Sequence, residues 1–171
     1  MIPQFENNLP ASSKVWIYQS SRKFTDNEAA VINEKIKHFA RKWTSHKAGV
    51  VGDGKLLYNY FIVLMADESQ VSVGGCSVDS SVHFIKELGN EFETNFFDRW
   101  NLAYKKNDEV IGCHRDDFEN LLITGEINDE TIVFNNLLNC KGDFETKWQV
   151  PYRESWLKNL RGAHISFSSI L

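Results

Sequence analysis

The chain has 171 residues, of which 42% are hydrophobic and 25% charged, and its formal net charge at pH 7 is −4. This composition is typical of one soluble globular domain with a sizeable core. The acidic balance argues against nucleic acid as the main partner, because binding to phosphates needs a basic face.

The N-terminus and the cysteines indicate the cellular compartment. The first residues lack a basic segment followed by an apolar run, so no secretory signal is visible. The longest apolar run, residues 61–66, is much shorter than the roughly 20 residues that a membrane-spanning helix needs. Cys76, Cys113 and Cys140 are widely spaced and do not suggest a disulfide framework. We therefore expect a cytoplasmic protein with reduced thiols and no membrane partner.

The first elements are predicted in the order strand, helix, strand. Residues 14–21 are rich in β-branched and aromatic side chains and predict a strand. Thr25 and Glu28 form a capping box before apolar residues at helical spacing, which predicts a helix that ends near His46. Residues 56–67 predict a strand with two apolar faces, and such a strand lies inside a sheet that is covered on both sides.

The remaining elements are shorter, apart from one more long helix. Residues 71–76 predict a strand that pairs with the preceding one, and a helix over residues 78–96 follows, capped by Asp79 or a neighbouring serine. Gly89 is expected to bend this helix or to end its regular part. The later predictions are a hairpin over 99–113, a helix over 116–124 that Gly125 ends, a strand over 131–136, and helical segments over 142–148 and 151–160.

The first two thirds of the chain thus follow the order β-α-β-β-α-β, which is that of ferredoxin-like, split β-α-β folds. We predict a single α+β domain over residues 1–171. Its ferredoxin-like core covers about residues 13–105, and a C-terminal extension over about residues 106–160 covers the second face of the sheet. In this arrangement we expect the first and third strands to be parallel neighbours at the centre of the sheet.

The segment Gly49 to Leu56 differs by one residue from the P-loop of many ATPases. A P-loop lies between a strand and a helix, and a hydroxyl residue after its lysine holds Mg²⁺. Here a predicted helix precedes the segment, a predicted strand follows it, and Leu56 cannot coordinate a cation. We therefore interpret the segment as a flexible helix-to-strand loop and expect no ATP binding through Lys55.

Five segments carry a resemblance to a known family: "YFIVLMADES", "GGCSVDSSVHFIKEL", "FDRWNLAY", "INDETIVFNNL" and "WQVPYRESW". They resemble a family of small, uncharacterised bacterial proteins that are often labelled "ABC transporter ATPase". The resemblance extends over roughly residues 12 to 158, and its motifs carry no known chemistry. The label implies an ATPase, which the sequence contradicts, because it has neither a Walker A motif in the right context nor the signature "LSGGQ".

The strongest candidate site is the start of the helix after Gly74 and Gly75, where unpaired backbone N–H groups are expected. If the first and third strands are parallel neighbours, the end of the first strand lies beside this helix start. A small anion would then be bound by side chains from both segments. These candidate ligand-binding residues are Ser20, Ser21, Arg22, Lys23, Cys76, Ser77, Asp79, Ser80 and Ser81. In the alternative interpretation, the serines and Asp79 are ordinary helix caps and the two cations are solvated.

Other candidate chemistry is weaker. Cys76 near a helix N-terminus and a cation would be a nucleophile, but catalysis also needs a base, and a buried packing residue is the alternative. Cys113 to Asp117 offers a thiol, an imidazole and two carboxylates, yet the expected strand-to-helix junction explains the aspartates as caps, so we predict no metal site. Trp16, Tyr18, Tyr58 and Tyr60 would stack bases if one sheet face were open, and otherwise form an aromatic core or a subunit interface.

Two hypotheses of function follow. The first is a non-catalytic binding or assembly module, monomeric or homodimeric, with an anion-tolerant pocket at the N-terminus of the second long helix. The alternative is a small enzyme that acts on an anionic substrate with Cys76 as nucleophile. Neither hypothesis requires a cofactor or a metal, and the lack of an evident acid–base pair beside Cys76 favours the first.

Overall fold

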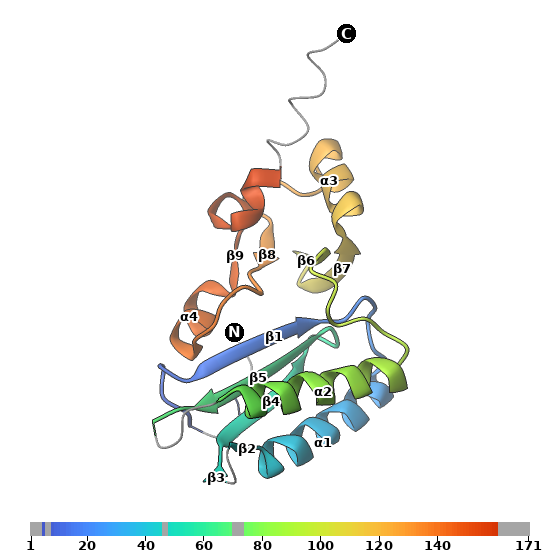
Figure 1. Cartoon of the computed structure of the whole chain (residues 1–171). Helices are drawn as coiled ribbons and strands as arrows, with labels where there is room; N and C mark the ends of the chain where they lie inside the picture. Colours follow the sequence, from blue (N-terminus) through green and yellow to red (C-terminus); the bar gives the residue numbers. More distant parts are fainter. Residues whose placement is uncertain (1–4, 6–7, 46–47, 70–73, 161–171) are drawn as a thin grey trace.

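The computed structural model describes residue 5 and residues 8–45, 48–69 and 74–160. It combines helices with two main antiparallel sheets, so the predicted α+β class is confirmed (Figure 1). None of the helices in these ranges has the length and apolar character that crossing a membrane requires.

The first sheet has three strands in the order β1-β5-β4, and the central β5 is antiparallel to both neighbours. The strands are β1 (Lys14–Gln19), β4 (Val51–Leu57) and β5 (Phe61–Asp67). Helices α1 (Asp26–Lys42) and α2 (Gly75–Glu91) cover one face of this sheet (Figure 1). A small hairpin of β2 (Thr44–Ser45) and β3 (Ala48–Gly49) connects α1 to β4.

The second sheet has the order β7-β6-β8-β9 and lies on the other side of the first sheet from α1 and α2 (Figure 1). Its strands are β6 (Asn101–Lys106), β7 (Glu109–His114), β8 (Ile132–Phe134) and β9 (Gln149–Pro151). The accompanying helices are α3 (Arg115–Thr124), α4 (Lys141–Lys147) and the 3₁₀ helices η1 (Tyr152–Glu154) and η2 (Trp156–Asn159).

Both faces of β5 are covered, as its sequence predicts. Residues 61–66 are fully buried. Ile62 and Leu64 pack against the helices, whereas Phe61 and Val63 pack against the second sheet and α4. The prediction of an interior strand in a doubly covered sheet is therefore confirmed, and the C-terminal elements provide the second cover.

The boundaries of that strand differ from the prediction. Tyr58 and Asn59 have positive φ angles of 53° and 58°, and they turn the chain between β4 and β5. The segment predicted as one long strand therefore contains the turn of a hairpin. The sequence does not reveal this turn, because apolar residues continue through it. A similar pair, Asn107 and Asp108, turns the chain in the predicted hairpin of β6 and β7, which is confirmed.

The two long helices also differ in detail from their predicted ends. The capping box of Thr25 and Glu28 starts α1 as expected, but α1 ends at Lys42, because Trp43 takes an extended conformation. Helix α2 begins at Gly75, with Gly74 as its cap and no side-chain cap bond, so the predicted cap by Asp79 or a serine is wrong. Gly89 stays inside α2.

The ferredoxin-like arrangement is not confirmed as a whole. Strands β1 and β4 point the same way on either side of β5, which is a split β-α-β unit, but β6 enters the second sheet instead of joining the first. Of the strand predicted over 71–76, residues 71–73 lie outside the described residues, and Gly75 and Cys76 belong to α2. The neighbour of β1 is β5, and this pair is antiparallel, so the expected parallel pair is wrong.

The segment that resembles a P-loop is mostly strand. Lys55 and Leu56 lie within β4, and the chain then turns into β5 rather than into a helix. The interpretation as a flexible loop is thus also wrong. A Cβ on Gly52 would lie 2.9 Å from the ring of Trp43, and one on Gly54 would lie 2.6 Å from Cγ2 of Ile36. These glycines therefore serve the close packing of α1 on the sheet.

Candidate functional site

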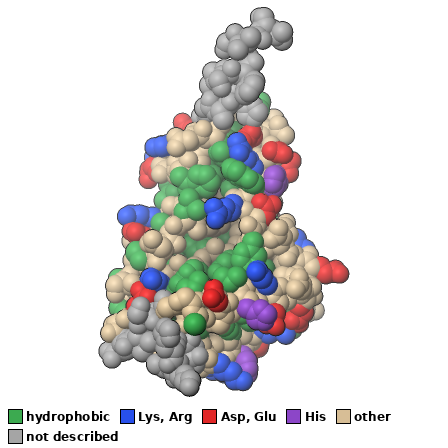
Figure 2. All heavy atoms as spheres, viewed as in Figure 1, with side chains coloured by type: hydrophobic (Ala, Val, Ile, Leu, Met, Phe, Trp, Pro, Cys, Tyr) green, Lys and Arg blue, Asp and Glu red, His purple; other side chains and the backbone are tan. Residues whose placement is uncertain are grey.

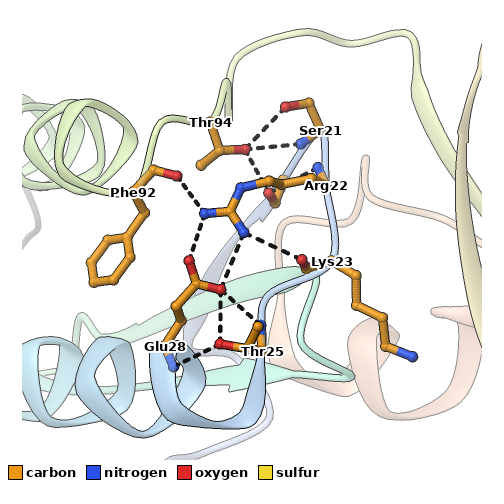
Figure 3. A network of polar contacts seen from close by, with 8 residues as sticks. Ser21, Arg22, Lys23, Thr25, Glu28, Phe92 and Thr94 are labelled. Atoms are coloured by element: carbon orange, nitrogen blue, oxygen red, sulfur yellow. Dashed lines mark hydrogen bonds and ion pairs between the residues drawn. The ribbon is translucent and has the colours of Figure 1, made fainter.

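The predicted anion pocket divides into two groups of residues that lie apart. Arg22 Nη2 donates a hydrogen bond of 2.6 Å to the carbonyl oxygen of Phe92, at the C-terminal end of α2 (Figure 3). Ser80 precedes Phe92 by 12 residues of α2, which is about 18 Å along the helix axis. The expected contact between Arg22 and the turn of Asp79–Ser81 is therefore wrong.

The antiparallel pairing of β1 and β5 explains this separation. Lys14 at the start of β1 lies opposite Ala66 near the end of β5, whereas Gln19 at the end of β1 lies opposite Phe61. The carboxyl ends of antiparallel neighbours lie at opposite edges of a sheet. The N-terminus of α2, which follows β5, is consequently at the edge opposite Ser20–Lys23.

At their own edge, Ser21 and Arg22 join three segments in one polar network (Figure 3), to which Ser20 also belongs. Arg22 forms a two-bond ion pair with Glu28, with N–O distances of 2.7 and 3.1 Å. Thr94 Oγ1 lies 2.6 Å from Ser20 Oγ and 3.0 Å from Ser21 Oγ. The guanidinium of Arg22 is thus already paired with a carboxylate and bonded to a carbonyl oxygen at a helix C-terminus.

At the other edge, Ser80 and Ser81 form hydrogen bonds within α2, and the side chain of Ser81 also bonds to that of Tyr18 in β1. Ser80 Oγ donates to the carbonyl oxygen of Ser77, and Ser81 Oγ donates to that of Val78. Ser77 and Ser81 are buried, whereas Asp79 is exposed. Without a nearby cation from the first strand, this helix start keeps only the general attraction of a helix N-terminus for anions.

Cys76 is exposed, so its interpretation as a buried packing residue is wrong. The nearest sequence candidate for a base, His83, is exposed and lies 3.3 Å from Glu87 Oε1. Cys113 is half-buried, and burial, followed by the charge of Asp117, raises the pKa of its thiol to about 12. No group of three or more His, Cys, Asp or Glu side chains in the described ranges is arranged to hold a metal ion.

A cleft between the two sheets was not predicted. It has a volume of about 430 Å³, and its walls come from β1, the α2–β6 connection, the segment after β8, and η2. Figure 2 shows a hollow between the lower and upper parts of the molecule, with hydrophobic side chains on both sides of it. The lining residues are Ile17, Tyr18, Gln19, Phe96, Phe97, Asp98, Arg99, Asn101, Leu102, Phe134, Asn136, Leu137 and Trp156.

A chain of side-chain hydrogen bonds forms the polar part of the cleft. Gln19 Nε2 donates to the carbonyl oxygen of Leu102 over 2.8 Å, and Asn136 Nδ2 donates to Gln19 Oε1 over 3.0 Å. Trp148 Nε1 in turn donates to Asn136 Oδ1 over 3.0 Å. Because Gln19 belongs to β1 and its partners to the second sheet and the segment after β8, these bonds fix the two walls relative to each other.

The cleft walls also present aromatic rings and a cation. The rings of Tyr18 and Phe97 meet edge to face with centroids 5.7 Å apart, and Phe97 is 42% exposed. Burial raises the pKa of Tyr18, which keeps its hydroxyl neutral. Arg99 is exposed, and no described side chain offers it an ion pair or a hydrogen bond.

Asp98 and Trp156 also contribute polar groups to the lining of the cleft. Asp98 Oδ1 accepts a hydrogen bond from the backbone of Trp100, and its Oδ2 lies 3.8 Å from His114 Nε2. The indole Nε1 of Trp156 is buried and has no hydrogen-bond partner among the described residues. The cleft therefore combines a guanidinium and a carboxylate with aromatic rings.

One sequence signal could have pointed to this cleft. Gln19 stands at an inward position of β1, on the same face as the apolar Val15 and Ile17, and buried amides need partners. The positions of Arg99 and Asn136 depend on the packing of the two sheets, which no local pattern encodes.

A scan against family models, a search of curated proteins and a search of solved structures each returned no match. The geometry of the chain itself therefore carries the functional interpretation.

Proposed function

We propose that the protein is a non-catalytic binding module that holds a small ligand in the cleft between β1 and the second sheet. The ligand has a ring-containing apolar body and a carboxylate or similar anionic group. This moves the anion-binding site from the start of α2 to the cleft. The observation that carries the proposal is the guanidinium of Arg99, which pairs with no described side chain and lies beside an aromatic wall and a fixed amide pair.

The size and lining of the cleft support a small-molecule site. Ligand pockets typically have volumes of about 300–1,000 Å³ and combine apolar walls with a few oriented polar groups. Tyr18 and Phe97 provide the apolar wall, and the amides of Gln19 and Asn136 provide the oriented polar groups. A ring would stack on Phe97 while its carboxylate accepts hydrogen bonds from Arg99.

The lining favours binding over catalysis. Its ionisable side chains are Tyr18, Asp98 and Arg99, and none of the described lining residues is a histidine or a cysteine. Nucleophilic catalysis pairs a nucleophile with a base within hydrogen-bond reach. The cleft walls do not provide such a pair.

Equilibrium dialysis with 2-naphthoate tests the proposal, with 2-naphthalenemethanol as an uncharged probe of similar shape. We expect 2-naphthoate to bind more tightly than the alcohol. An exposed cation contributes about 1 kcal/mol after screening by solvent, so Arg99→Gln should weaken 2-naphthoate binding about fivefold. Arg41→Gln, the same change on the outer surface of α1, should leave binding unchanged. Equal binding of the two probes, or equal effects of the two substitutions, would contradict the proposal.

The exposure of Cys76 favours the enzyme with a Cys76 nucleophile as the second candidate. No hydrogen bond joins this thiol to another described residue, so we expect iodoacetamide to modify it at about the rate of the same thiol in urea. Peptide mapping after a short reaction at pH 7.5 measures both rates. A rate in the native protein that is about 100-fold higher would instead support the nucleophile.

Membership of the family of small bacterial proteins stays a prediction. The ATPase label attached to that family is not part of the proposal, because Lys55 lies within a strand that turns into another strand.

A further inference from the structure

The outer face of the helix layer carries a groove between α1 and α2, on the side of these helices away from the sheets. Its volume is about 850 Å³. In its wall, the rings of Phe39 and Phe84 stack with centroids 4.4 Å apart and an interplanar angle of 3°. Val31 also lines the groove and is 48% exposed. Contiguous apolar surface of this kind often marks an interaction site.

The two helices run antiparallel, so the groove has two distinct ends. Trp43, just after α1, donates to the carbonyl oxygen of Ser77 near the start of α2. At the opposite end, Lys35 of α1 lies 3.0 Å from Glu91 near the end of α2. The stacked pair of Phe39 and Phe84 lies between these two contacts.

The charges that line the groove differ between its ends. The end near Trp43 carries Arg41 and Lys42, both exposed and without an ion pair to any described residue. The end near Lys35 carries three carboxylates, namely Glu34, Glu87 and Glu91. Glu91 pairs with Lys35, and Glu34 lies 3.5 Å from Lys37. The groove therefore has a basic end and an acidic end, with an apolar centre.

We propose that this groove is the contact surface between two copies of the chain. A two-fold axis that is perpendicular to the groove and passes over Phe39 and Phe84 lays each basic end over the acidic end of the partner. The same patch then serves both copies, as a two-fold interface requires. The attraction between the basic end of one copy and the acidic end of the other sets the relative orientation of the two copies. The apolar centres of the two grooves become buried against each other.

The size of the surface is consistent with a reversible dimer. Each helix has 17 residues. Such a helix is about 25 Å long and about 10 Å wide with its side chains, so the two helices side by side present a face of about 500 Å². Two such faces together bury about 1,000 Å², which is at the lower end for specific interfaces. We therefore expect an association that depends on salt and on protein concentration.

Sedimentation equilibrium of charge-reversed variants tests this interface, and all of the substituted side chains are exposed. Arg41→Glu with Lys42→Glu makes both ends acidic, and Glu34→Lys with Glu87→Lys makes both ends basic. Each double variant alone should have a dissociation constant at least tenfold higher than the unchanged chain. An equimolar mixture of the two should associate again, because acidic ends then face basic ends. Lys86→Glu with Lys158→Glu changes the charge outside the groove and should leave the dimer intact.

Several outcomes would overturn the proposal. The unchanged chain staying monomeric at the highest concentration reached would show that a second copy does not fill the groove. Dimers that survive either reversal would show that association uses another surface. A mixture that associates no better than its components would exclude the two-fold arrangement. Circular dichroism of each variant separates these outcomes from unfolding.

Discussion

Arg22 shows how a single residue connects elements that are distant in the chain. Its guanidinium bonds to Glu28 in the first turn of α1 and to the carbonyl oxygen of Phe92 at the end of α2. A cation is favourable at a helix C-terminus, and a carboxylate is favourable at a helix N-terminus. The ion pair of Arg22 and Glu28 thus places a negative charge at the N-terminus of α1 and a positive charge at the C-terminus of α2, and both placements are favourable.

This ion pair predicts a specific dependence of stability on pH. The hydrogen bonds from Arg22, and then that from the backbone N–H of Thr25, lower the pKa of Glu28 to about 2 from its ordinary value of 4.5. Because the folded pKa is the lower one, Glu28 stabilises the fold above about pH 4.5, and this contribution is lost as the pH falls to about 2. Urea unfolding between pH 2 and pH 6 measures the free energy of unfolding. As the pH falls, this free energy should decrease less for Glu28→Gln than for the unchanged chain.

Glu109→Gln is the matched control, since Glu109 pairs with Lys23 on the exposed surface. It should leave the acid dependence close to that of the unchanged chain. Parallel curves for Glu28→Gln and the unchanged chain would contradict the role given to the Arg22–Glu28 pair.

At the residue scale, the sequence predicts local partners and misses distant ones. The capping box of Thr25 and Glu28 is visible because its two members are three residues apart. The bond from Arg22 to Phe92 spans 70 residues, and only the pairing of the strands brings its two ends together.

Strand β4 shows at the element scale why a motif needs its structural context. Gly54 is the second glycine of the P-loop spacing that begins at Gly49, yet the missing side chains of Gly54 and of the neighbouring Gly52 make room for Ile36 and Trp43. The glycines thus allow α1 to lie close to the sheet.

Gly54→Ala should destabilise the fold by about 1–3 kcal/mol, because the new methyl group overpacks the contact between α1 and the sheet. Gly49→Ala is the matched control, since a Cβ there meets nothing within 4 Å. Urea unfolding at pH 7 measures both free energies of unfolding. A Gly54→Ala variant as stable as the control would show that the helix does not need the glycine.

The sequence predicts elements well where a single periodic pattern covers the whole element. The capping and spacing of α1 and the end of α3 at Gly125 agree with the predictions. The hairpin of β4 and β5 is missed because Tyr58 and Asn59 have no glycine to mark their turn. The start of α2 is missed because two glycines before a helix also fit the end of a strand.

At the scale of the whole molecule, the amide chain from Trp148 through Asn136 to Gln19 joins the two sheets. Asn136→Ala should destabilise the fold by about 1–3 kcal/mol, since Gln19 Oε1 and Trp148 Nε1 lose their partners. Asn139→Ala removes an exposed amide nearby and should change the stability by less than about 0.5 kcal/mol. Equal free energies of unfolding for the two variants would show that the amide chain does not hold the sheets together.

The relation between the two sheets could not be predicted from the sequence. The order of elements along the chain is compatible with β6 joining the first sheet, and equally with β6 joining a second sheet. The burial of β5 on both faces indicates a second cover but not its position. The cleft depends on that position, so its lining residues, from Gln19 to Trp156, are far apart in the chain.

The most direct test of the binding cleft is the indole N–H signal of Trp156 in ¹H–¹⁵N NMR spectra during titration with 2-naphthoate. Trp156 lines the cleft, whereas the indole N–H of Trp43 donates a hydrogen bond to the carbonyl oxygen of Ser77 in α2. Occupation of the cleft predicts a saturable shift of the Trp156 signal and an unchanged Trp43 signal, with Trp156→Phe and Trp43→Phe to assign them. A Trp156 signal that stays in place while 2-naphthoate binds, or equal shifts of both signals, would contradict a ligand site between the sheets.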